Sequence, residues 1–277
     1  MEALHLALFG NPVAHSLSPA IHQAFADQCG LKLDYELILA TEENFSEQLE
    51  QLRSSGARGC NITVPLKVPA HNIADTLSTA AATAGAANTL VFQQHGVFAD
   101  NTDGLGWLKD LDRTDTSIKG KSVAIIGAGG AAAGITPVIL AQSPDTLVIA
   151  NRSPEKAADL LRQQLNPNFR SVSLKQLHQP DLPKFDLLVN ATSIGHQGKH
   201  PELFPELFNP DALLYDLNYG TAAEPLKTWC NNNGIRYRDG LGMLVEQAAL
   251  AFTLWTGKSP ETQAVLSDLR SKLRQKN

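Results

Sequence analysis

A short apolar run that leads directly into a glycine-rich turn, AIIGAGGAAAG at residues 124–134, constrains this chain more than any other stretch. Gly127, Gly129 and Ala132 give the spacing GxGxxA. In that pattern the first glycine permits a tight turn after a strand, and the second lets the backbone approach a pyrophosphate, which the free N–H groups of the next helix can bind. Because a strand pattern precedes the turn and a helix pattern follows it, we interpret the stretch as a dinucleotide site rather than as a purely structural turn. Pro137 lies inside that helix pattern and lacks an N–H donor, so we expect a bend or an early end there.

The next apolar run, LVIA, ends at Asn151 and Arg152. Enzymes that use NAD commonly place Asp or Glu near this point to bind the ribose 2′-hydroxyl, whereas a guanidinium suits the 2′-phosphate of NADP. Arg152, Ser153 and Lys156 make this position cationic. A solvated loop with two basic residues is the alternative, but a cation in the first turn of a helix is unfavourable unless an anion binds there. The sequence therefore predicts NADP as the cofactor.

Composition and charge argue against several classes of function. With 277 residues, of which 43% are hydrophobic, the chain can build one large core or two modest ones, and we favour two domains. Its net charge of -5 argues against nucleic acid or an anionic membrane as the main partner. Cys29, Cys60 and Cys230 stand far apart, which is typical of reduced thiols in the cytoplasm. We expect no signal peptide and no membrane span, because the first residues lack a basic cluster and no apolar run reaches about 18 residues. His196 and His200 have metal-like spacing, but a solvated loop is the better interpretation, and we expect no metal.

Strand and helix patterns alternate along most of the chain, which predicts an α/β fold with parallel pairing. Apolar runs at 4–9, 34–40 and 58–64 are typical of strands, and helical spacing fills 18–30 and 44–56 between them.

The middle and the end of the chain extend this pattern. Two strand-like runs within 89–103 flank Gln94, His95 and Gly96, which predicts a hairpin. A second strand and helix series starts at Lys121, and the apolar, glycine-bounded stretch 239–257 predicts a long helix that returns to the first domain. We therefore expect two domains with a cleft between them, where ligands bind preferentially.

The stretch NITVPLK, residues 61–67, places polar side chains where a strand would end. Asn61 and Thr63 share one face of the predicted strand, and Pro65 ends it. Lys67 then emerges near the carboxyl end of the strand, where α/β sheets bind their ligands. Taken alone, the stretch is better interpreted as a surface lysine on a loop after two polar residues of an edge strand.

Further polar residues lie close to predicted strand ends. Ser18 before Pro19 predicts a helix N-cap, whereas Ser16 has no such structural role and could, with Ser18, offer a hydroxyl to a carboxylate. Asn88 and Asp103 lie at turns, and Asp103 by itself would be interpreted as the cap of the following helix.

Eight stretches occur in the order seen in shikimate dehydrogenases, and the chain resembles that family over nearly its whole length. They are GNPVAHSLSP, GCNITVPLK, AGAANT, DNTDG, GAGGAA, NATSIG, YDLNY and DGLGMLVEQAA. The resemblance implies an NADP-dependent oxidoreductase that reduces 3-dehydroshikimate to shikimate on the way to chorismate and the aromatic amino acids. It also implies an α/β substrate-binding domain, residues 1–103 completed by 241–277, and a Rossmann-like NADP-binding domain, residues 104–240.

The resemblance assigns roles to individual residues. Lys67 and Asp103 match the catalytic acid–base pair. The substrate-binding positions are Ser16, Ser18, Asn61, Thr63, Asn88, Tyr219 and Gln247. The cofactor-binding positions are Gly127, Ala128, Gly129, Gly130, Ala131, Asn151, Arg152, Ser153, Lys156, Thr192, Leu217 and Gly240, the last two on the nicotinamide side.

Besides Thr221 and Glu224, which follow YDLNY, three positions depart from the family pattern. Ala133 stands where Arg or Lys is frequent, Ser153 where Thr is usual, and Leu217 where Met is common. The first two departures lower the polar content near the phosphate, but Arg152 and Lys156 keep NADP the expected cofactor.

Two other functions fit part of this pattern. A dual-specificity quinate/shikimate dehydrogenase would share the architecture and differ in the room around the substrate. A non-enzymatic NADP-binding sensor would need the glycine turn but not Lys67 together with Asp103. We expect a small-molecule substrate, and a chain that acts as a monomer or a homodimer.

Overall fold

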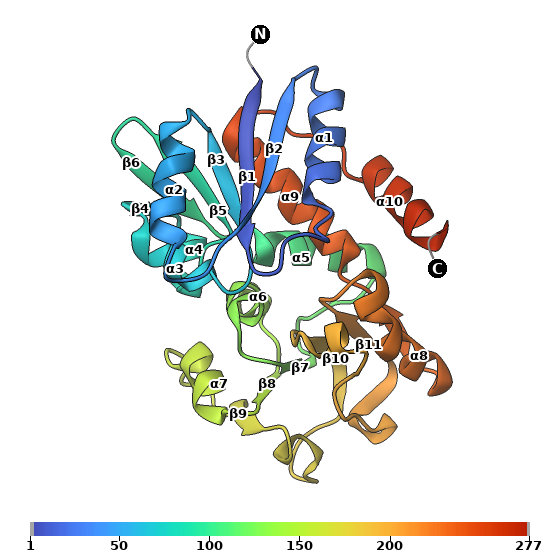
Figure 1. Cartoon of the computed structure of the whole chain (residues 1–277). Coiled ribbons are helices and arrows are strands. Elements are labelled where there is room, and N and C mark those ends of the chain that lie inside the picture. Colours follow the sequence, from blue (N-terminus) through green and yellow to red (C-terminus); the bar gives the residue numbers. More distant parts are fainter. Residues whose placement is uncertain (1–2, 276–277) are drawn as a thin grey trace. The chain divides into compact units, whose positions relative to one another are not determined.

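The computed structural model describes residues 3–275, which fall into two compact units (Figure 1). Unit 1 holds the described residues up to Gly106 and from Leu244 onward, and unit 2 runs from Trp107 to Met243. The predicted domain ranges also include the first two and the last two residues, which lie outside the described part of the chain.

Two helices contain the points at which the chain passes from one unit to the other. They are α5 (Asp103–Leu111) and α9 (Leu241–Thr256). The helix predicted at 239–257 is therefore confirmed as α9. Within residues 3–275, no helix is both long enough and apolar enough to cross a membrane.

Unit 1 contains a six-stranded mixed sheet in the order β2-β1-β3-β5-β6-β4. Its strands are β1 (Leu4–Gly10), β2 (Leu33–Leu39), β3 (Gly59–Ile62), β4 (Thr76–Leu77), β5 (Thr89–Gln93) and β6 (Gly96–Asp100). β1 pairs in parallel with β2 and β3, whereas β5 runs antiparallel to both β3 and β6. The predicted hairpin is therefore confirmed as β5 and β6. The carboxyl ends of β1, β3 and β6 consequently share one edge of the sheet with the amino end of β5.

Helices pack on both faces of this sheet. Besides α5, the α-helices in or entering this unit are α1 (Ser18–Gln28), α2 (Phe45–Ser54), α3 (Lys67–Ile73), α4 (Thr79–Ala84), α9 and α10 (Gln263–Gln275). Successive side chains of β1 point to opposite faces. Phe9 accordingly packs edge to face on Phe45 of α2, with ring centres 5.5 Å apart, while Leu6 packs with Trp255 of α9. Burial on both faces explains why β1 is an almost continuous apolar run.

Two local predictions in unit 1 are wrong. Ser18 is not an N-cap, because α1 already begins at Ser18 and the hydroxyl of Ser16 accepts the Ser18 N–H at 3.2 Å. The strand predicted at 58–64 ends at Ile62, because Thr63 enters a turn in which its carbonyl accepts the N–H of Leu66 at 2.9 Å. Thr63 and Val64 therefore lie between the end of β3 and Pro65, so the proline does not end the strand.

Unit 2 contains a six-stranded, wholly parallel sheet in the order β12-β11-β10-β7-β8-β9. Its strands are β7 (Ser122–Ile126), β8 (Thr146–Asn151), β9 (Phe169–Ser173), β10 (Phe185–Asn190), β11 (Phe208–Asp216) and β12 (Arg236–Arg238). Numbered from β7, this is the order 3-2-1-4-5-6 of a dinucleotide-binding sheet, with the reversal of strand order between β7 and β10. Ligands bind outside the carboxyl ends of the strands at such a reversal.

Helices cover both faces of the second sheet as well. The α-helices confined to unit 2 are α6 (Gly130–Ala141), α7 (Pro154–Leu161) and α8 (Glu224–Asn232), and the 3-10 turns are η1 (Asp112–Thr114), η2 (Gln176–His178), η3 (Ile194–Gln197), η4 (Pro205–Leu207) and η5 (Gly220–Ala223). The predicted early end of the helix at Pro137 is wrong, because α6 continues to Ala141. Ile135 and Ile139, on either side of the proline, are fully buried, and this packing offsets the missing hydrogen bond. The alternative, a bend, stays a prediction.

Candidate active site

Lys67 and Asp103 form an ion pair at the shared strand edge of unit 1. Lys67 is the first residue of α3, which follows β3, and Asp103 is the first residue of α5, which follows β6. The Lys67 ammonium donates to Oδ2 of Asp103, and the two side chains are 13% and 6% exposed. Asp103 is not the cap that precedes the helix, because α5 already begins at Asp103, whose N–H donates to Oδ1 of Asn101 at 3.1 Å. The two residues that the sequence places far apart thus form one buried charged unit.

Asn88 connects this pair to α9. Its Nδ2 lies 2.9 Å from Oδ1 of Asp103 and 3.1 Å from Oε1 of Gln247, and its Oδ1 accepts the N–H of Thr102 at 2.9 Å. Asn88 is 2% exposed, so these contacts replace water around its amide. The orientation of Asp103 is therefore fixed by an amide that has almost no freedom of its own.

Asn61 is held in the same way at the end of β3. Its Oδ1 accepts from the Tyr35 hydroxyl at 2.8 Å and from Nε2 of His22 at 3.0 Å, and its Nδ2 lies 3.3 Å from the carbonyl of Asn88. The His22 ring stacks on Tyr35 with centres 4.9 Å apart. Burial lowers the pKa of His22 to about 3, so the ring is neutral at pH 7 and donates one hydrogen bond from Nε2.

The serine and threonine positions lie on neighbouring segments of unit 1. The hydroxyls of Ser16 and Ser18 are 3.1 Å apart, Ser18 is buried and Ser16 is half-buried. Thr63 follows β3 and passes so close to β1 that a Cβ on Gly10 would lie 2.3 Å from Cγ2 of Thr63. Only glycine fits at that position, which brings the residues after β1 close to those after β3.

The glycine turn of unit 2 has the geometry that the sequence predicts. Gly127 directly follows β7 with φ +108°, and a Cβ there would lie 2.9 Å from the carbonyl oxygen of Ala191. Gly129 has open space where a Cβ would be, and α6 begins at Gly130. Gly127 is therefore tightly packed, whereas the space beside Gly129, just before the amino end of α6, is free. This free space lets a phosphate approach the backbone.

Cationic residues follow β8 as expected. Asn151 ends the strand and its Nδ2 donates to the carbonyl of Ser153 at 3.0 Å, which shapes the turn before α7. Arg152 lies in this turn and Lys156 in the first helical turn, and both are exposed. Between residues 3 and 275, neither cation has an ion-pair partner, so both are available to an anion.

The remaining cofactor positions lie at the ends of β10, β11 and β12. The hydroxyl of Thr192 donates to Oδ1 of Asn190 at 2.7 Å, and the carbonyl of Thr192 accepts from Nδ2 of Asn218 at 2.9 Å. A Cβ on Gly240 would lie 2.3 Å from the carbonyl oxygen of Leu217, so the two segments touch backbone to backbone. These residues form a second rigid region beside the glycine turn.

Comparison with known proteins identifies the family. The model of the shikimate dehydrogenase substrate binding domain matches residues 8–90, that of shikimate / quinate 5-dehydrogenase matches 110–209, and that of the shikimate 5′-dehydrogenase C-terminal domain matches 240–270. The shikimate dehydrogenase (NADP(+)) of Dechloromonas aromatica is 44% identical over 96% of this chain and 97% of its own length. The chain belongs to the shikimate dehydrogenase family.

Solved structures agree with this assignment. The shikimate 5-dehydrogenase of Thermus thermophilus, crystallised with NADP(H) and shikimate, matches with a TM-score of 0.82 and 32% identity over 97% of this chain and 99% of that one. An Ael1 enzyme from Pseudomonas putida matches with a TM-score of 0.85 and 37% identity over 96% of this chain and 97% of that one. The predicted family, its dehydrogenase class and the two-domain α/β fold with a Rossmann-like part are confirmed.

One residue assigned by resemblance to the shikimate dehydrogenase pattern stands apart from its group. Tyr219 follows β11 in unit 2, whereas the other six substrate positions belong to unit 1. Burial raises the pKa of its hydroxyl, so Tyr219 stays a neutral donor at pH 7. Its role toward the substrate stays a prediction.

Sequence reasoning missed several residues that form hydrogen bonds within one or the other of these two strand edges. Tyr35 lies in no recognised stretch, and only its position on the strand next to β1 could have suggested it. Asp216 and Asn218 lie within YDLNY, so the motif itself was the signal. The fully buried Asp216 accepts from Asn190 and Asn218, and burial raises its pKa.

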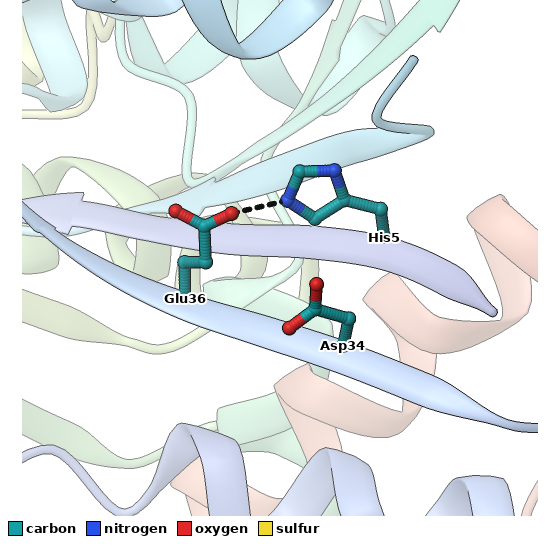
Figure 2. Close-up of side chains that lie close together, drawn as sticks. All are labelled: His5, Asp34 and Glu36. Carbon is teal, nitrogen blue, oxygen red and sulfur yellow. Dashed lines mark hydrogen bonds and ion pairs between the residues drawn. The ribbon is translucent and has the colours of Figure 1, made fainter. Parts of the chain in front are cut away.

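A separate cluster of possible metal ligands lies on the sheet of unit 1 (Figure 2). His5 of β1 faces Asp34 and Glu36 of β2, and Nε2 of His5 lies 2.5 Å from Oε1 of Glu36. Both carboxylates are exposed, so an ordinary surface hydrogen bond between His5 and Glu36 explains the contact. His196 and His200 belong to no such group among the described residues. The expectation of no metal stays a prediction.

Proposed function

We propose that this chain catalyses the reversible NADPH-dependent reduction of 3-dehydroshikimate to shikimate, with Lys67 and Asp103 as its acid–base pair. The observation that carries the proposal is the buried ion pair between these two residues, fixed by Asn88 at the ligand-binding edge of a sheet. Its relatives are named as NADP-dependent shikimate dehydrogenases, which supports the same substrate and cofactor. A non-enzymatic sensor would have no use for such a pair.

The chemistry follows from the residue types. Bound NADPH supplies the hydride. As the substrate carbonyl gains negative charge, the Lys67 ammonium stabilises the oxygen and gives it a proton. Asp103 keeps the ammonium oriented and accepts a hydrogen bond from the new hydroxyl, so the two residues act as one unit. In the oxidation direction the same groups take the proton back.

Substrate recognition is proposed for the polar residues around this pair. The neighbouring hydroxyls of Ser16 and Ser18 suit a carboxylate, because two donors can bind its two oxygens. The remaining positions are proposed to bind the ring hydroxyls and to contribute to binding of the carboxylate. They are Asn61, Thr63, Asn88, Gln247 and Tyr219. The rigid amides among them favour one arrangement of hydroxyls, and this is the basis for discrimination.

Cofactor binding is proposed for the edge of the second sheet. The open backbone at Gly129 suits the pyrophosphate, Arg152 and Lys156 suit the 2′-phosphate, and Leu217 with Gly240 suit the nicotinamide end. Unit 1 is accordingly the proposed substrate domain and unit 2 the proposed NADP domain. A cytoplasmic location and a monomeric or homodimeric state stay predictions.

Initial rates test the proposal. Shikimate oxidation is measured with NADP, and then repeated with NAD and with quinate, to compare kcat/KM across the set. We expect the shikimate and NADP pair to lead by more than about 100-fold, or roughly 2.7 kcal/mol in transition-state binding. Comparable rates with quinate or NAD would replace the proposal by a dual-specificity enzyme, and no activity with any pair would overturn it.

A further inference from the structure

A fully buried carboxylate, Asp110 of α5, has no role in the proposed chemistry. It accepts from Nε and Nη2 of Arg238 at 2.9 and 2.5 Å, from the Tyr215 hydroxyl at 2.8 Å, and from Arg113 at 3.4 Å. Its side chain is 0% exposed and that of Arg238 is 20% exposed. A two-point guanidinium–carboxylate contact of this kind fixes the direction of both groups.

Arg238 ends β12 and directly precedes the turn that contains Gly240. The N–H of Gly240 donates to the carbonyl of Asn218 at 2.9 Å, and a Cβ on Gly240 would lie 2.3 Å from the carbonyl oxygen of Leu217. This turn is therefore seated directly against the end of β11, with no room for a side chain.

The far side of the turn rests on the same carboxylate. A Cβ on Gly242 would lie 1.8 Å from Oδ1 of Asp110, so Asp110 touches the chain on both sides of Gly240. It accepts two hydrogen bonds from Arg238 before the turn, and it packs closely against Gly242 after the turn. One buried side chain thus sets the path of the Arg238–Gly242 segment.

We infer that Asp110 is a positioning residue that places the Gly240 turn, and through it the nicotinamide end of the cofactor, for hydride transfer. The inference rests on the proposed function, because Gly240 and Leu217 matter only if a nicotinamide lies beside them. Asp110 acts through Arg238 and Gly242 and contacts neither substrate nor cofactor in this account. Displacements of about 1 Å at a reacting centre can lower a rate about 100-fold, so a device that fixes this turn has a direct kinetic role.

The test separates the nicotinamide end from the adenosine end. Asp110→Asn keeps the size of the side chain and removes the charge that holds Arg238, while Arg238→Lys keeps the charge and removes the two-point contact. We expect kcat with NADP and shikimate to fall about 100-fold in Asp110→Asn and by less in Arg238→Lys. In the reduction of 3-dehydroshikimate, the kinetic isotope effect from deuterium at the hydride-donating carbon of NADPH should rise in both variants. The Kd of adenosine 2′,5′-bisphosphate, which lacks a nicotinamide, should stay within twofold.

A matched control changes another aspartate of unit 2, one that lies in the sheet instead of in α5. Asp186 of β10 accepts the N–H of Ser122 at 2.9 Å near the amino ends of the strands, so Asp186→Asn should leave kcat and the isotope effect unchanged. Unchanged kinetics in Asp110→Asn would overturn the inference, and so would a Kd of the bisphosphate that weakens in parallel with that of NADP. If Asp110→Asn does not fold, the isotope effect and the Kd of the bisphosphate are measured in Arg238→Lys instead, and the same outcomes decide. An inactive wild-type chain would overturn the proposed function instead. The Kd of NADP and the Kd of the bisphosphate, compared between wild type and Asp110→Asn, would still test whether Asp110 affects only the nicotinamide end.

Discussion

The edge of unit 1 that contains Lys67 and the edge of unit 2 that contains Arg152 are prepared for ligands in opposite ways. In unit 1 the polar side chains are buried and already bonded to one another, as Lys67 is to Asp103 and Asn61 is to Tyr35. At the edge of unit 2, Arg152 and Lys156 are exposed and form no ion pair with any described residue, and no side chain fills the space beside Gly129.

This difference shows that the edge of unit 1 supplies side chains of fixed direction, whereas the edge of unit 2 supplies unpaired charge and free N–H donors. Groups that take part in proton transfer need a fixed direction, and a buried hydrogen-bonded network provides it at the cost of losing contact with water. Groups that bind a phosphate need unsatisfied charge and free N–H donors, so internal partners would weaken them. Changes at the first edge should therefore affect turnover, and changes at the second should affect cofactor affinity.

The largest expected effect is at the buried pair. Lys67→Ala removes the proton donor and should lower kcat about 1000-fold with little change in the KM for shikimate, because general acid catalysis contributes at this scale. Asp103→Asn should cost a similar amount, and the double variant little more, since the two residues act as one unit. Steady-state rates of the three variants check this. A kcat close to wild type in Lys67→Ala would contradict the assignment of proton transfer to the edge of unit 1.

The second effect sharpens the contrast at the cofactor edge. Replacing Arg152 and Lys156 by Gln should lower kcat/KM with NADP by about 10- to 100-fold and leave the value with NAD unchanged, because only NADP has the 2′-phosphate. Rates with both cofactors at low and high salt check this, and the salt dependence should disappear with the two cations. Arg162→Gln is the matched control, because Arg162 of the same region is already paired with Asp159 at 2.5 Å. Equal losses with NAD would contradict the assignment.

The third effect is a pH dependence of unit 1. His22 has a folded pKa of about 3 against an ordinary value of 6.5, so the unfolded chain binds the proton first as the pH falls. The contribution of neutral His22 is complete above about pH 6.5 and is lost by roughly 1.4 kcal/mol per pH unit below it. Urea unfolding between pH 7.5 and 5 should show a steeper loss for wild type than for His22→Gln. Parallel slopes would mean that His22 is not buried as a neutral ring.

The smallest effect concerns one hydroxyl on each side of the comparison. Tyr35→Phe removes a donor to Asn61 and should cost about 1 kcal/mol of stability together with a severalfold rise in the KM for shikimate. Tyr237→Phe removes a donor to Asp216, 3.2 Å away in unit 2, and should cost a similar amount of stability without that rise. Thermal unfolding and substrate titration of both variants check this. A rise in both would show that the two edges are not independent.

Much of the fold could be predicted because it depends on local pattern. The period of two in the strands, the helical spacing and the glycine turn give most elements of both sheets, and the hairpin of β5 and β6 follows from its central turn. The boundaries were less certain where local and distant contacts compete. Leu17 takes the N-cap position of α1 that the sequence assigns to Ser18, with the Ser18 N–H bound by the Ser16 hydroxyl, and buried isoleucines extend α6 past Pro137.

The candidate site divides in the same way. Motifs supply Lys67, Asp103 and the glycine turn, because chemistry limits which residue types can act there. They do not supply Tyr35 or Asp110, because neither has a local signature and each matters only through a partner distant in sequence.

By itself, the sequence determined the family, the α/β class, the glycine turn and the residue types available for proton transfer and phosphate binding. These depend on side-chain identity and on spacing along the chain. Only the tertiary structure decided that β5 runs antiparallel beside β3, that Asn88 orients Asp103, and that Asp110 holds both sides of the Gly240 turn. The reason is physical: such contacts join segments far apart in the chain, and their geometry is set when the cores pack and buried polar groups must find partners.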